Sequence, residues 1–133
     1  MQYNRRDFIA MSGTAACLAA MPAWGKPKKL SILILGGTGF IGPHFVDVLT
    51  DGGHTVTLFN RGKRDAETKH GVEQLLGDRN GDLKSLESRD WDVVIDNSGY
   101  TPGQVKLSTG LLRGHVRQYL FISSIAVYDD FQN

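Results

Sequence analysis

Cysteine is almost absent from this sequence of 133 residues, which contains only Cys17. A single chain therefore forms no internal disulfide, and a metal site built on cysteines is excluded. The four histidines stand at positions 44, 54, 70 and 115, and no two are spaced as closely as the ligands of a local metal motif. The sequence thus gives no indication of a disulfide scaffold or a metal centre.

A surplus of basic charge is also missing beyond the first segment. Residues 1–29 contain five Lys and Arg residues and one acid, whereas residues 30–133 contain ten basic and thirteen acidic residues. The larger part is mildly acidic and has no basic stripe, which argues against a nucleic-acid surface. A hydrophobic content of 41% and a charged content of 22% are typical of one soluble globular domain.

The first segment has the layout of an export signal. Two arginines precede an uncharged run, residues 8–25, that is rich in small residues and ends near Ala23. The run Arg5-Arg6-Asp7-Phe8-Ile9 resembles the twin-arginine signal. We therefore expect a signal peptide at 1–23, a linker at 24–29, passage through the twin-arginine translocase, and a periplasmic or otherwise exported protein.

Three other interpretations of this segment stay open. An amphipathic helix would confine its apolar residues to one face, and they are not so confined here. A membrane anchor needs about 20 strongly apolar residues, and this run consists largely of small ones. A lipoprotein signal would use Cys17, but Thr14 stands three residues before it where a leucine is usual.

Short apolar runs alternate with helical patterns in the rest of the chain. Strands are expected where β-branched and apolar residues cluster between glycines and polar turns, at 30–35, 54–59, 72–76, 91–95 and 118–122. Helices are expected at 40–50, 83–89 and 104–113. Strands that alternate with helices predict an α/β fold with a parallel sheet covered on both faces.

Four glycines gather where the first expected strand meets the first helix. Gly36, Gly39 and Gly42 have the spacing G-x-x-G-x-x-G. Gly36 would permit a sharp turn, Gly39 would let a pyrophosphate approach the main chain, and Gly42 would let the helix pack closely. The N–H groups of the first helical turn would then face the phosphates. The alternative is a tight turn without a ligand.

The stretch "ILGGTGFIG", residues 34–42, resembles the extended short-chain dehydrogenase/reductase superfamily, also called the NAD-dependent epimerase/dehydratase family. The resemblance extends from about Leu30 to Tyr128. Together with "LFNRGK" it is most similar to an atypical branch that includes chloroplast RNA-binding proteins and bacterial relatives. It implies a Rossmann-like doubly wound parallel sheet of five strands in the order 3-2-1-4-5. It also implies a set of cofactor contacts in the glycine loop: Gly36, Thr38, Gly39, Phe40, Ile41 and Gly42.

The end of the second strand indicates which nicotinamide cofactor is preferred. An acid there would bind the ribose hydroxyls and repel a 2′-phosphate, but this chain has Asn60 and Arg61. Arg61 can pair with a phosphate, and one such bond is worth about ten- to a hundredfold in affinity. Lys63 and Arg64 could add to the same field. We expect NADP to be preferred over NAD, unless these bases are simply solvated.

Two further loops lie where the family places cofactor contacts. By resemblance, Asp78 would face the adenine amino group with Arg79 beside it. The loop of Asn97, Ser98 and Gly99 would line the ribose and phosphates on the nicotinamide side. Both loops follow strands, where open α/β sheets bind ligands, although each could be an ordinary turn on spacing alone.

The segment from Ser123 to Tyr128 is similar to the S-S-x-x-V-Y segment of the family. By that match Ser124 would hydrogen-bond the reacting oxygen of the substrate, and Ser123 would lie beside the nicotinamide. The Y-x-x-x-K pair of the family is absent, since Tyr128 is followed four residues later by Gln132. We expect a chain truncated after the fifth strand, with a genuine short protein as the alternative.

The expected function is that of the dinucleotide-binding part of an exported epimerase, dehydratase or reductase. Its substrate would be a small molecule such as a nucleotide sugar. Two alternatives remain: a non-catalytic family member that binds a dinucleotide or RNA, and a remnant that binds neither. The mild acidity of residues 30–133 argues against RNA.

Overall fold

The computed structural model describes residues 28–63 and 71–124. The expected signal peptide, most of the linker, Arg64 and Tyr128 lie outside the described residues. Within them, no helix is sufficiently long and apolar to span a membrane.

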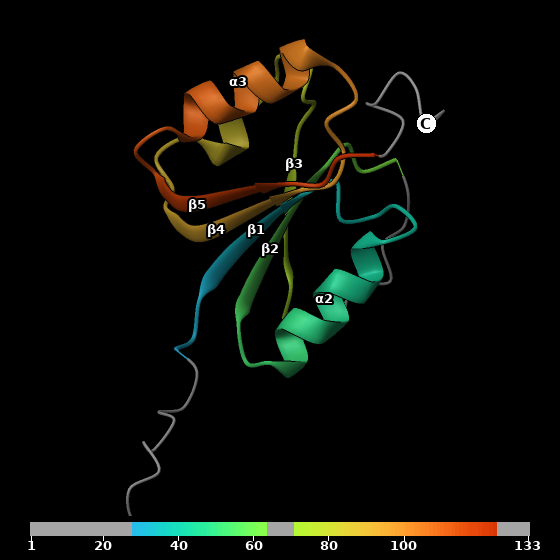
Figure 1. Ribbon diagram of the computed structural model, residues 1–133, viewed down its shortest axis with the longest axis vertical. Coiled ribbons are helices and arrows are strands. Elements are labelled where there is room, and N and C mark those ends of the chain that lie inside the picture. Colours follow the sequence, from blue (N-terminus) through green and yellow to red (C-terminus); the bar gives the residue numbers. More distant parts are fainter. Residues whose placement is uncertain (1–27, 64–70, 125–133) are drawn as a thin grey trace, which may run out of the picture.

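Five parallel strands form one sheet in the order β3-β2-β1-β4-β5, which confirms the predicted topology (Figure 1). All four neighbouring pairs run parallel. The strands are β1 (Ser31–Leu35), β2 (Thr55–Asn60), β3 (Glu73–Leu76), β4 (Trp91–Asp96) and β5 (Val116–Phe121). Each lies within two residues of its predicted position.

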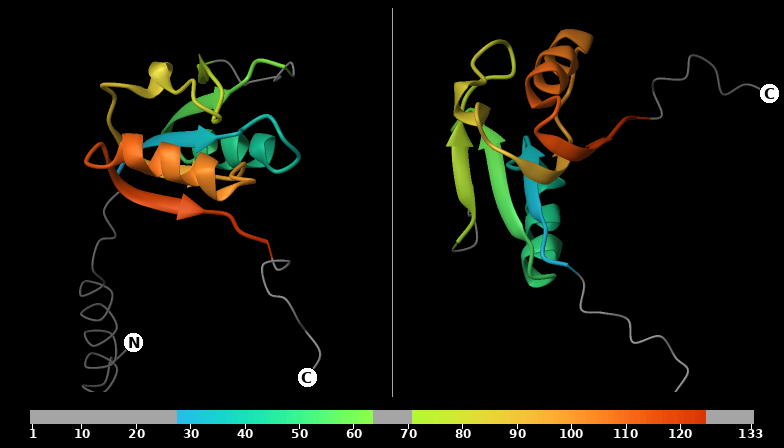
Figure 2. Two further views of the ribbon diagram at one scale, coloured as in Figure 1. Left: turned by 90° about the horizontal axis from the view of Figure 1, so that it is seen from above. Right: turned by 90° about the vertical axis from the view of Figure 1, so that its left-hand side faces the viewer.

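Among the described residues, the helices α2 and α3 lie on opposite faces of the sheet (Figure 2). Alternate residues of β1 point to opposite faces, because side chains in a strand alternate with a period of two. Ile32 and Ile34 pack in a core with Val46 of α2 (Gly42–Asp51). Leu33 and Leu35 pack in the second core with Leu112 of α3 (Pro102–Leu112). The apolar run of β1 thus belongs to a strand that is buried on both sides, whereas the apolar run at the end of β5 is largely exposed, contrary to the expectation of a sheet covered on both faces.

The helix predicted at 83–89 is wrong in length. The structure has only the 3-10 turn η1 (Lys84–Leu86), after which Glu87 is extended and Ser88 takes a left-handed φ of 59°. Leu83 and Leu86 are both buried, so their spacing reflects one anchored turn and not a helix face. By contrast, α3 begins two residues earlier than predicted, because Thr101 caps it and Pro102 occupies its first turn.

The carboxyl ends of the strands meet along one edge of the sheet. Leu35 of β1 lies opposite Phe59 of β2 and Asp96 of β4, and Asp96 lies opposite Phe121 of β5. The loops that leave β1, β2, β3 and β4 therefore begin side by side. This edge is where an open α/β sheet binds ligands.

Candidate functional site

A cleft of about 210 Å³ lies at this edge. It is lined by residues from the loops after β1, β2, β3 and β4, and by α3. They are Gly36, Thr38, Gly39, Phe59, Asn60, Arg61, Lys63, Gly77, Asp78, Arg79, Asn80, Ser98, Tyr100 and Gln104. The cleft thus crosses the point where the strand order reverses between β1 and β4.

The glycine loop forms the sharp corner between β1 and α2. Gly36 has a φ of +88°, and its N–H donates to the carbonyl of Phe59 at 2.9 Å. A Cβ on Gly36 would overlap Ser98, and a Cβ on Gly42 would overlap the backbone of Gly37. Gly39 differs, because a Cβ there would have no neighbour closer than the Gly36 oxygen at 3.9 Å. Two of the glycines are therefore required for packing, while Gly39 leaves the corner open.

The start of α2 has unpaired donors. Ile41 at the N-cap gives no side-chain hydrogen bond to the first turn, which contains Pro43. Among the described residues, the N–H groups of Phe40 and Ile41 have no acceptor. A helix N-terminus with free N–H groups and its positive dipole end favours an anion. The bare corner at Gly39 beside these donors therefore fits a diphosphate.

A tight turn presents Arg61 after β2. The side-chain oxygen of Asn60 accepts from the N–H of Gly62 at 2.8 Å and from Gln74 at 2.9 Å. Gly62 has a φ of +66°, which this turn requires. Asn60 is 8% exposed, and its Nδ2 has no partner among the described residues. Asn60 thus fixes the turn and keeps one buried donor at the cleft.

Charges of both signs meet at the mouth of the cleft. Asp78 accepts from the backbone N–H of Asn80 at 2.9 Å and from its side chain at 2.8 Å. The hydrogen bond from the Asn80 backbone, more than the nearby charges of Arg61 and Lys63, lowers the pKa of Asp78. The carboxylate therefore stays ionised at neutral pH and lies near both bases.

A buried ion pair lies beneath the cleft, and sequence analysis missed it. Arg79 is 7% exposed and binds the carboxylate of Asp96, which is 0% exposed, through both terminal nitrogens. Arg79 also donates to Ser108 of α3 at 2.7 Å. The hydroxyl of Tyr119 donates to Asp96 at 2.6 Å. The only signal of this network in the sequence was Asp96, the aspartate that directly follows the apolar run "DVVI".

Burial and the hydrogen bond to Asp96 change the pKa of the Tyr119 phenol. Burial, reinforced by that hydrogen bond, raises the pKa of Tyr119 to about 12. The phenol is therefore a hydrogen-bond donor at every physiological pH. It is engaged in the network beneath the cleft and does not line the cleft.

The structure brings eight of the predicted site residues to the cleft: Gly36, Thr38, Gly39, Asn60, Arg61, Asp78, Arg79 and Ser98. Seven others lie beside it or further along the edge: Phe40, Ile41, Gly42, Asn97, Gly99, Ser123 and Ser124. Ser123 and Ser124 are exposed beyond the end of β5. The guanidinium of Arg79 is engaged within the protein, so its predicted contact with a dinucleotide stays a prediction.

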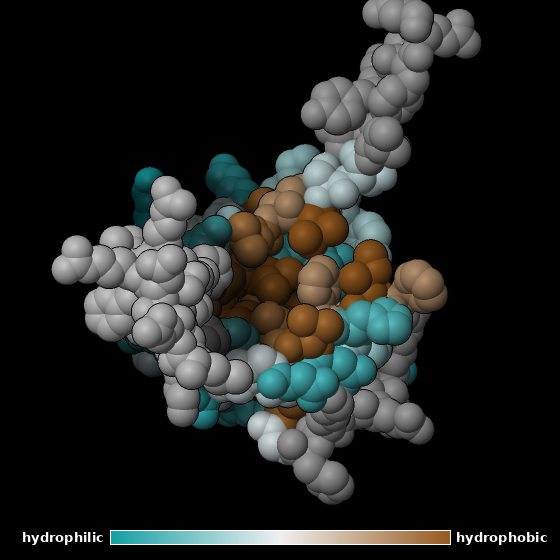
Figure 3. Space-filling model, turned by 60° about the horizontal axis from the view of Figure 1, so that its bottom comes forward, coloured by the Kyte–Doolittle hydropathy of each residue, from teal (hydrophilic) through white to brown (hydrophobic). Residues whose placement is uncertain are grey.

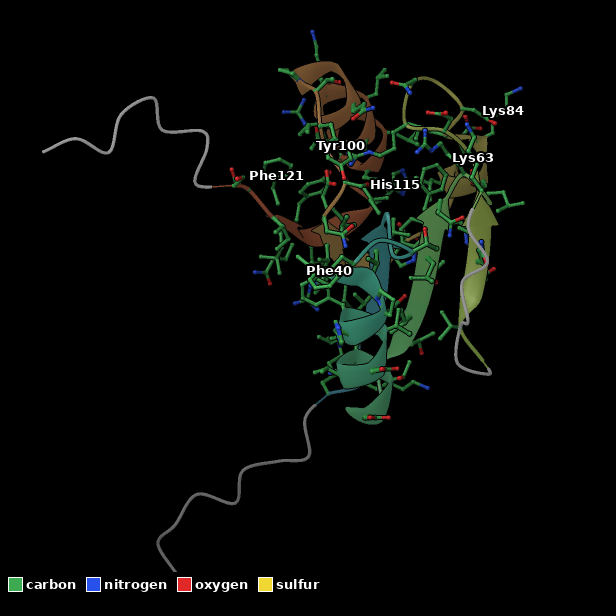
Figure 4. The ribbon with its side chains drawn as sticks, turned by 90° about the vertical axis from the view of Figure 1, so that its right-hand side faces the viewer. Phe40, Lys63, Lys84, Tyr100, His115 and Phe121 are labelled. Carbon is green, nitrogen blue, oxygen red and sulfur yellow. The ribbon has the colours of Figure 1, made fainter. Side chains whose placement is uncertain are left out.

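Sequence analysis did not single out several cleft residues, namely Phe59, Gly77, Asn80, Tyr100 and Gln104. Tyr100 is 87% exposed and Phe40 is 92% exposed. Figure 4 shows them on the loops after β4 and β1, with Phe121 at the end of β5 and Lys63 on the loop after β2. A second, mostly apolar cleft between Phe121 and the start of α3 also contains Tyr100.

Within residues 28–63 and 71–124, no three His, Cys, Asp or Glu side chains are grouped so that they could hold a metal ion. The donors at the cleft are amides, hydroxyls and basic side chains, which suit an anionic ligand.

Residues 32–100 match the family model described as the NAD dependent epimerase/dehydratase family. The matched region runs from β1 through the glycine loop to Tyr100. It therefore contains most of the residues that line the cleft.

A curated relative is the chloroplast stem-loop binding protein of 41 kDa b from Arabidopsis thaliana. It is 35% identical over 117 residues, which cover 76% of this chain and 31% of the relative. The chain therefore spans about a third of the length of that relative.

Solved structures share the fold at low identity. An epimerase from Methanothermobacter thermautotrophicus has a TM-score of 0.68 at 16% identity, covering 78% of this chain and 38% of its own. A UDP-galactose 4-epimerase has a TM-score of 0.67 at 23% identity, covering 77% and 41%. The Bordetella bronchiseptica enzyme WbmG, in complex with NAD, has a TM-score of 0.60 at 14% identity, covering 74% and 38%.

Proposed function

Because this chain belongs to the NAD dependent epimerase/dehydratase family, we propose that its cleft binds a nicotinamide dinucleotide. One observation carries the proposal: apart from its chain neighbours, Gly39 has no atom crowding the position of a Cβ, and it lies beside the N–H groups of Phe40 and Ile41, which have no acceptor among the described residues. These groups would hold the diphosphate, with the dipole of α2 adding roughly 0.3–1 kcal/mol. The solved complex of WbmG with NAD supports this assignment.

The nicotinamide ring of such a cofactor supplies a hydride acceptor or donor when it is bound. The residues of this chain would bind and orient it. Asn60 lines the cleft with a buried amide donor that has no partner in residues 28–63 and 71–124, and Arg61 is exposed at the turn after β2. By the family resemblance, Asp78 would accept from the adenine amino group.

We further propose a preference for NADP over NAD. No acid occupies the end of β2, and Arg61 and Lys63 both line the cleft. Arg61→Ala is expected to raise the Kd of NADPH about ten- to a hundredfold and to leave the Kd of NADH nearly unchanged. Arg89→Ala is the matched control, since Arg89 pairs with Glu73 on the surface. If Arg61→Ala weakens the binding of NADPH and NADH equally, or weakens neither, Arg61 does not determine the preference for NADP.

The proposed reaction class is that of an epimerase, dehydratase or reductase acting on a nucleotide sugar or a similar small molecule. WbmG has been solved with NAD and UDP, and other neighbours are titled UDP-glucose and UDP-galactose 4-epimerases. Ser124 is proposed to hydrogen-bond the reacting oxygen of the substrate. In saturation-transfer NMR with NADPH present, UDP-glucose should show contact with the wild-type chain and weaker contact with Ser124→Ala. No contact with the wild-type chain would argue against this substrate class.

Export through the twin-arginine route is proposed from the first segment alone. Residues 1–29 fused to a reporter protein should direct it to the periplasm of a bacterial host. Replacing Arg5 and Arg6 together by lysine should abolish this export, whereas replacing Lys28 and Lys29 by arginine should not. A fusion that stays in the cytoplasm would overturn the proposal.

RNA binding is a second candidate function, favoured by one observation. The relative that is 35% identical is named as a stem-loop binding protein. A stem-loop RNA should then shift the mobility of the chain on a native gel, and the shift should weaken steeply as salt rises. No shift at low salt would leave only the dinucleotide proposal.

A further inference from the structure

Arg79 joins four separate parts of the fold beneath the cleft. It comes from the loop after β3 and pairs with Asp96 at the end of β4. It donates to the Ser108 hydroxyl on α3 at 2.7 Å, and Tyr119 of β5 shares its partner Asp96. Among the described residues, no other Arg or Lys side chain is buried. A charge placed this deeply costs free energy unless it is paired, and among the described residues Arg79 is paired through both terminal nitrogens while its Nε has no partner.

The same network reaches the glycine loop through Ser98. Arg79 donates to the Ser98 hydroxyl at 3.3 Å, and Asp96 accepts from the Ser98 N–H at 3.2 Å. The Ser98 hydroxyl donates to the carbonyl of Leu35 at 3.0 Å. Its side chain occupies the space that a Cβ on Gly36 would fill. Ser98 therefore lies wedged against the corner at Gly36, and Arg79 and Asp96 hold it there.

We propose that Arg79 is a positioning residue: through Ser98 it fixes the glycine loop in the shape that receives the diphosphate. This inference rests on the proposed binding of a dinucleotide. It differs from the expected role of Arg79 as a direct contact of the cofactor. Both terminal nitrogens of Arg79 are committed to protein acceptors, which favours action through the protein.

The planar guanidinium suits this role better than lysine would. It presents five donors in a fixed fork, so it can bind both oxygens of Asp96 and reach two hydroxyls at once. Arg79→Lys would keep the positive charge beside Asp96 but could not keep every bond. The variant therefore separates charge from positioning.

A double-mutant cycle with NADPH as the probe tests the proposal. Arg79→Lys and Ser98→Ala are each expected to raise the Kd of NADPH roughly tenfold, the worth of one charge-assisted hydrogen bond. Because Arg79 and Ser98 act through the same contact with the Gly36 corner, the double variant should raise the Kd no further than the larger of the two single effects. Arg89→Lys, in the surface pair with Glu73, should leave the Kd unchanged.

A second measurement needs no ligand. The amide NMR signals of Gly36 and Gly37 should shift in Arg79→Lys and stay in place in Arg89→Lys. Each variant is first checked for cooperative thermal unfolding. If Arg79→Lys does not fold, Ser108→Ala takes its place, because it removes one anchor of Arg79 and leaves the pair with Asp96 intact.

The outcomes are distinct. Coupled losses of affinity together with shifted glycine signals support the proposal. If the fold-changes in Kd of the two single variants multiply in the double variant, Arg79 contacts the cofactor directly. If Arg79→Lys lowers the melting temperature but leaves the Kd unchanged, Arg79 has a purely structural role. Either result would contradict the positioning role. If the wild-type chain binds neither NADPH nor NADH, the proposed function fails and the inference fails with it.

Discussion

At the scale of single residues, Tyr119 shows how burial determines a chemical property. Its hydroxyl donates to the fully buried carboxylate of Asp96. Burial first, and then this bond, raises its pKa from the ordinary value of 10.0 to about 12. In the unfolded chain the phenol loses its proton near pH 10, while the folded chain keeps it.

The folded state should therefore lose stability as the pH rises from about 10 to about 12. The contribution of Tyr119 is fully present below pH 10, because both states are then protonated. Urea unfolding across this range should show a smaller decline for Tyr119→Phe than for the wild type. An identical decline would mean that Tyr119 ionises alike in both states.

Two glycines within helices provide a matched comparison. Gly42→Ala places a methyl group on the backbone of Gly37 and should destabilise the fold by roughly 1–3 kcal/mol. Gly110→Ala in α3 meets nothing within 4 Å and should stabilise it by about 0.5–1 kcal/mol. Denaturant unfolding of both variants measures the difference. Equal effects would mean that the close approach at Gly42 does not matter.

At the scale of elements, α2 packs against the sheet through one face of the helix. Val46 is 4% exposed in the core beneath β1 and β2, whereas Val48 is 71% exposed on the same helix. Val46→Ala should cost roughly 2 kcal/mol, the transfer term of two methyl groups and a small cavity. Val48→Ala should change the free energy of unfolding by less than about 0.5 kcal/mol. Similar losses for both would contradict the observed orientation of α2.

The elements also show what the sequence could predict. The strands were predictable because runs such as "LSILIL" are apolar on both faces, as central parallel strands must be. The turn at η1 was not, because Leu83 and Leu86 fit a helix and an anchored turn equally well. The glycine corner was predictable from spacing alone. The network of Arg79 and Asp96 was not, because its members come from four distant segments and only the folded sheet brings them together.

At the scale of the whole molecule, one side of the sheet is incompletely covered. Leu120 and Ile122 are 40% and 42% exposed, and Leu120 lies in register with Ile95 of the core on the α2 face. Figure 3 shows hydrophobic side chains gathered in a hollow on the lower face of the molecule. Within the described residues, β5 is also an edge strand without an outer neighbour.

An exposed apolar edge strand promotes association between chains. The 133-residue chain should therefore self-associate as its concentration rises, which light scattering after size-exclusion chromatography can measure. Leu120→Lys should shift it toward the monomer, whereas Leu107→Lys, on the exposed side of α3, should do so less. A wild-type chain that stays monomeric at high concentration would show that this face does not mediate self-association.

Fluorescence titration of NADPH measures whether the corner at Gly39 receives a diphosphate. Gly39 has no positive φ, and a Cβ there meets nothing closer than 3.9 Å, so Gly39→Val should fold as the wild type does. The wild-type chain and Gly110→Ala should bind NADPH saturably, whereas Gly39→Val should lose binding with its melting temperature unchanged. A Gly39→Val chain that binds NADPH as tightly as the wild type would contradict the binding of a diphosphate at this corner.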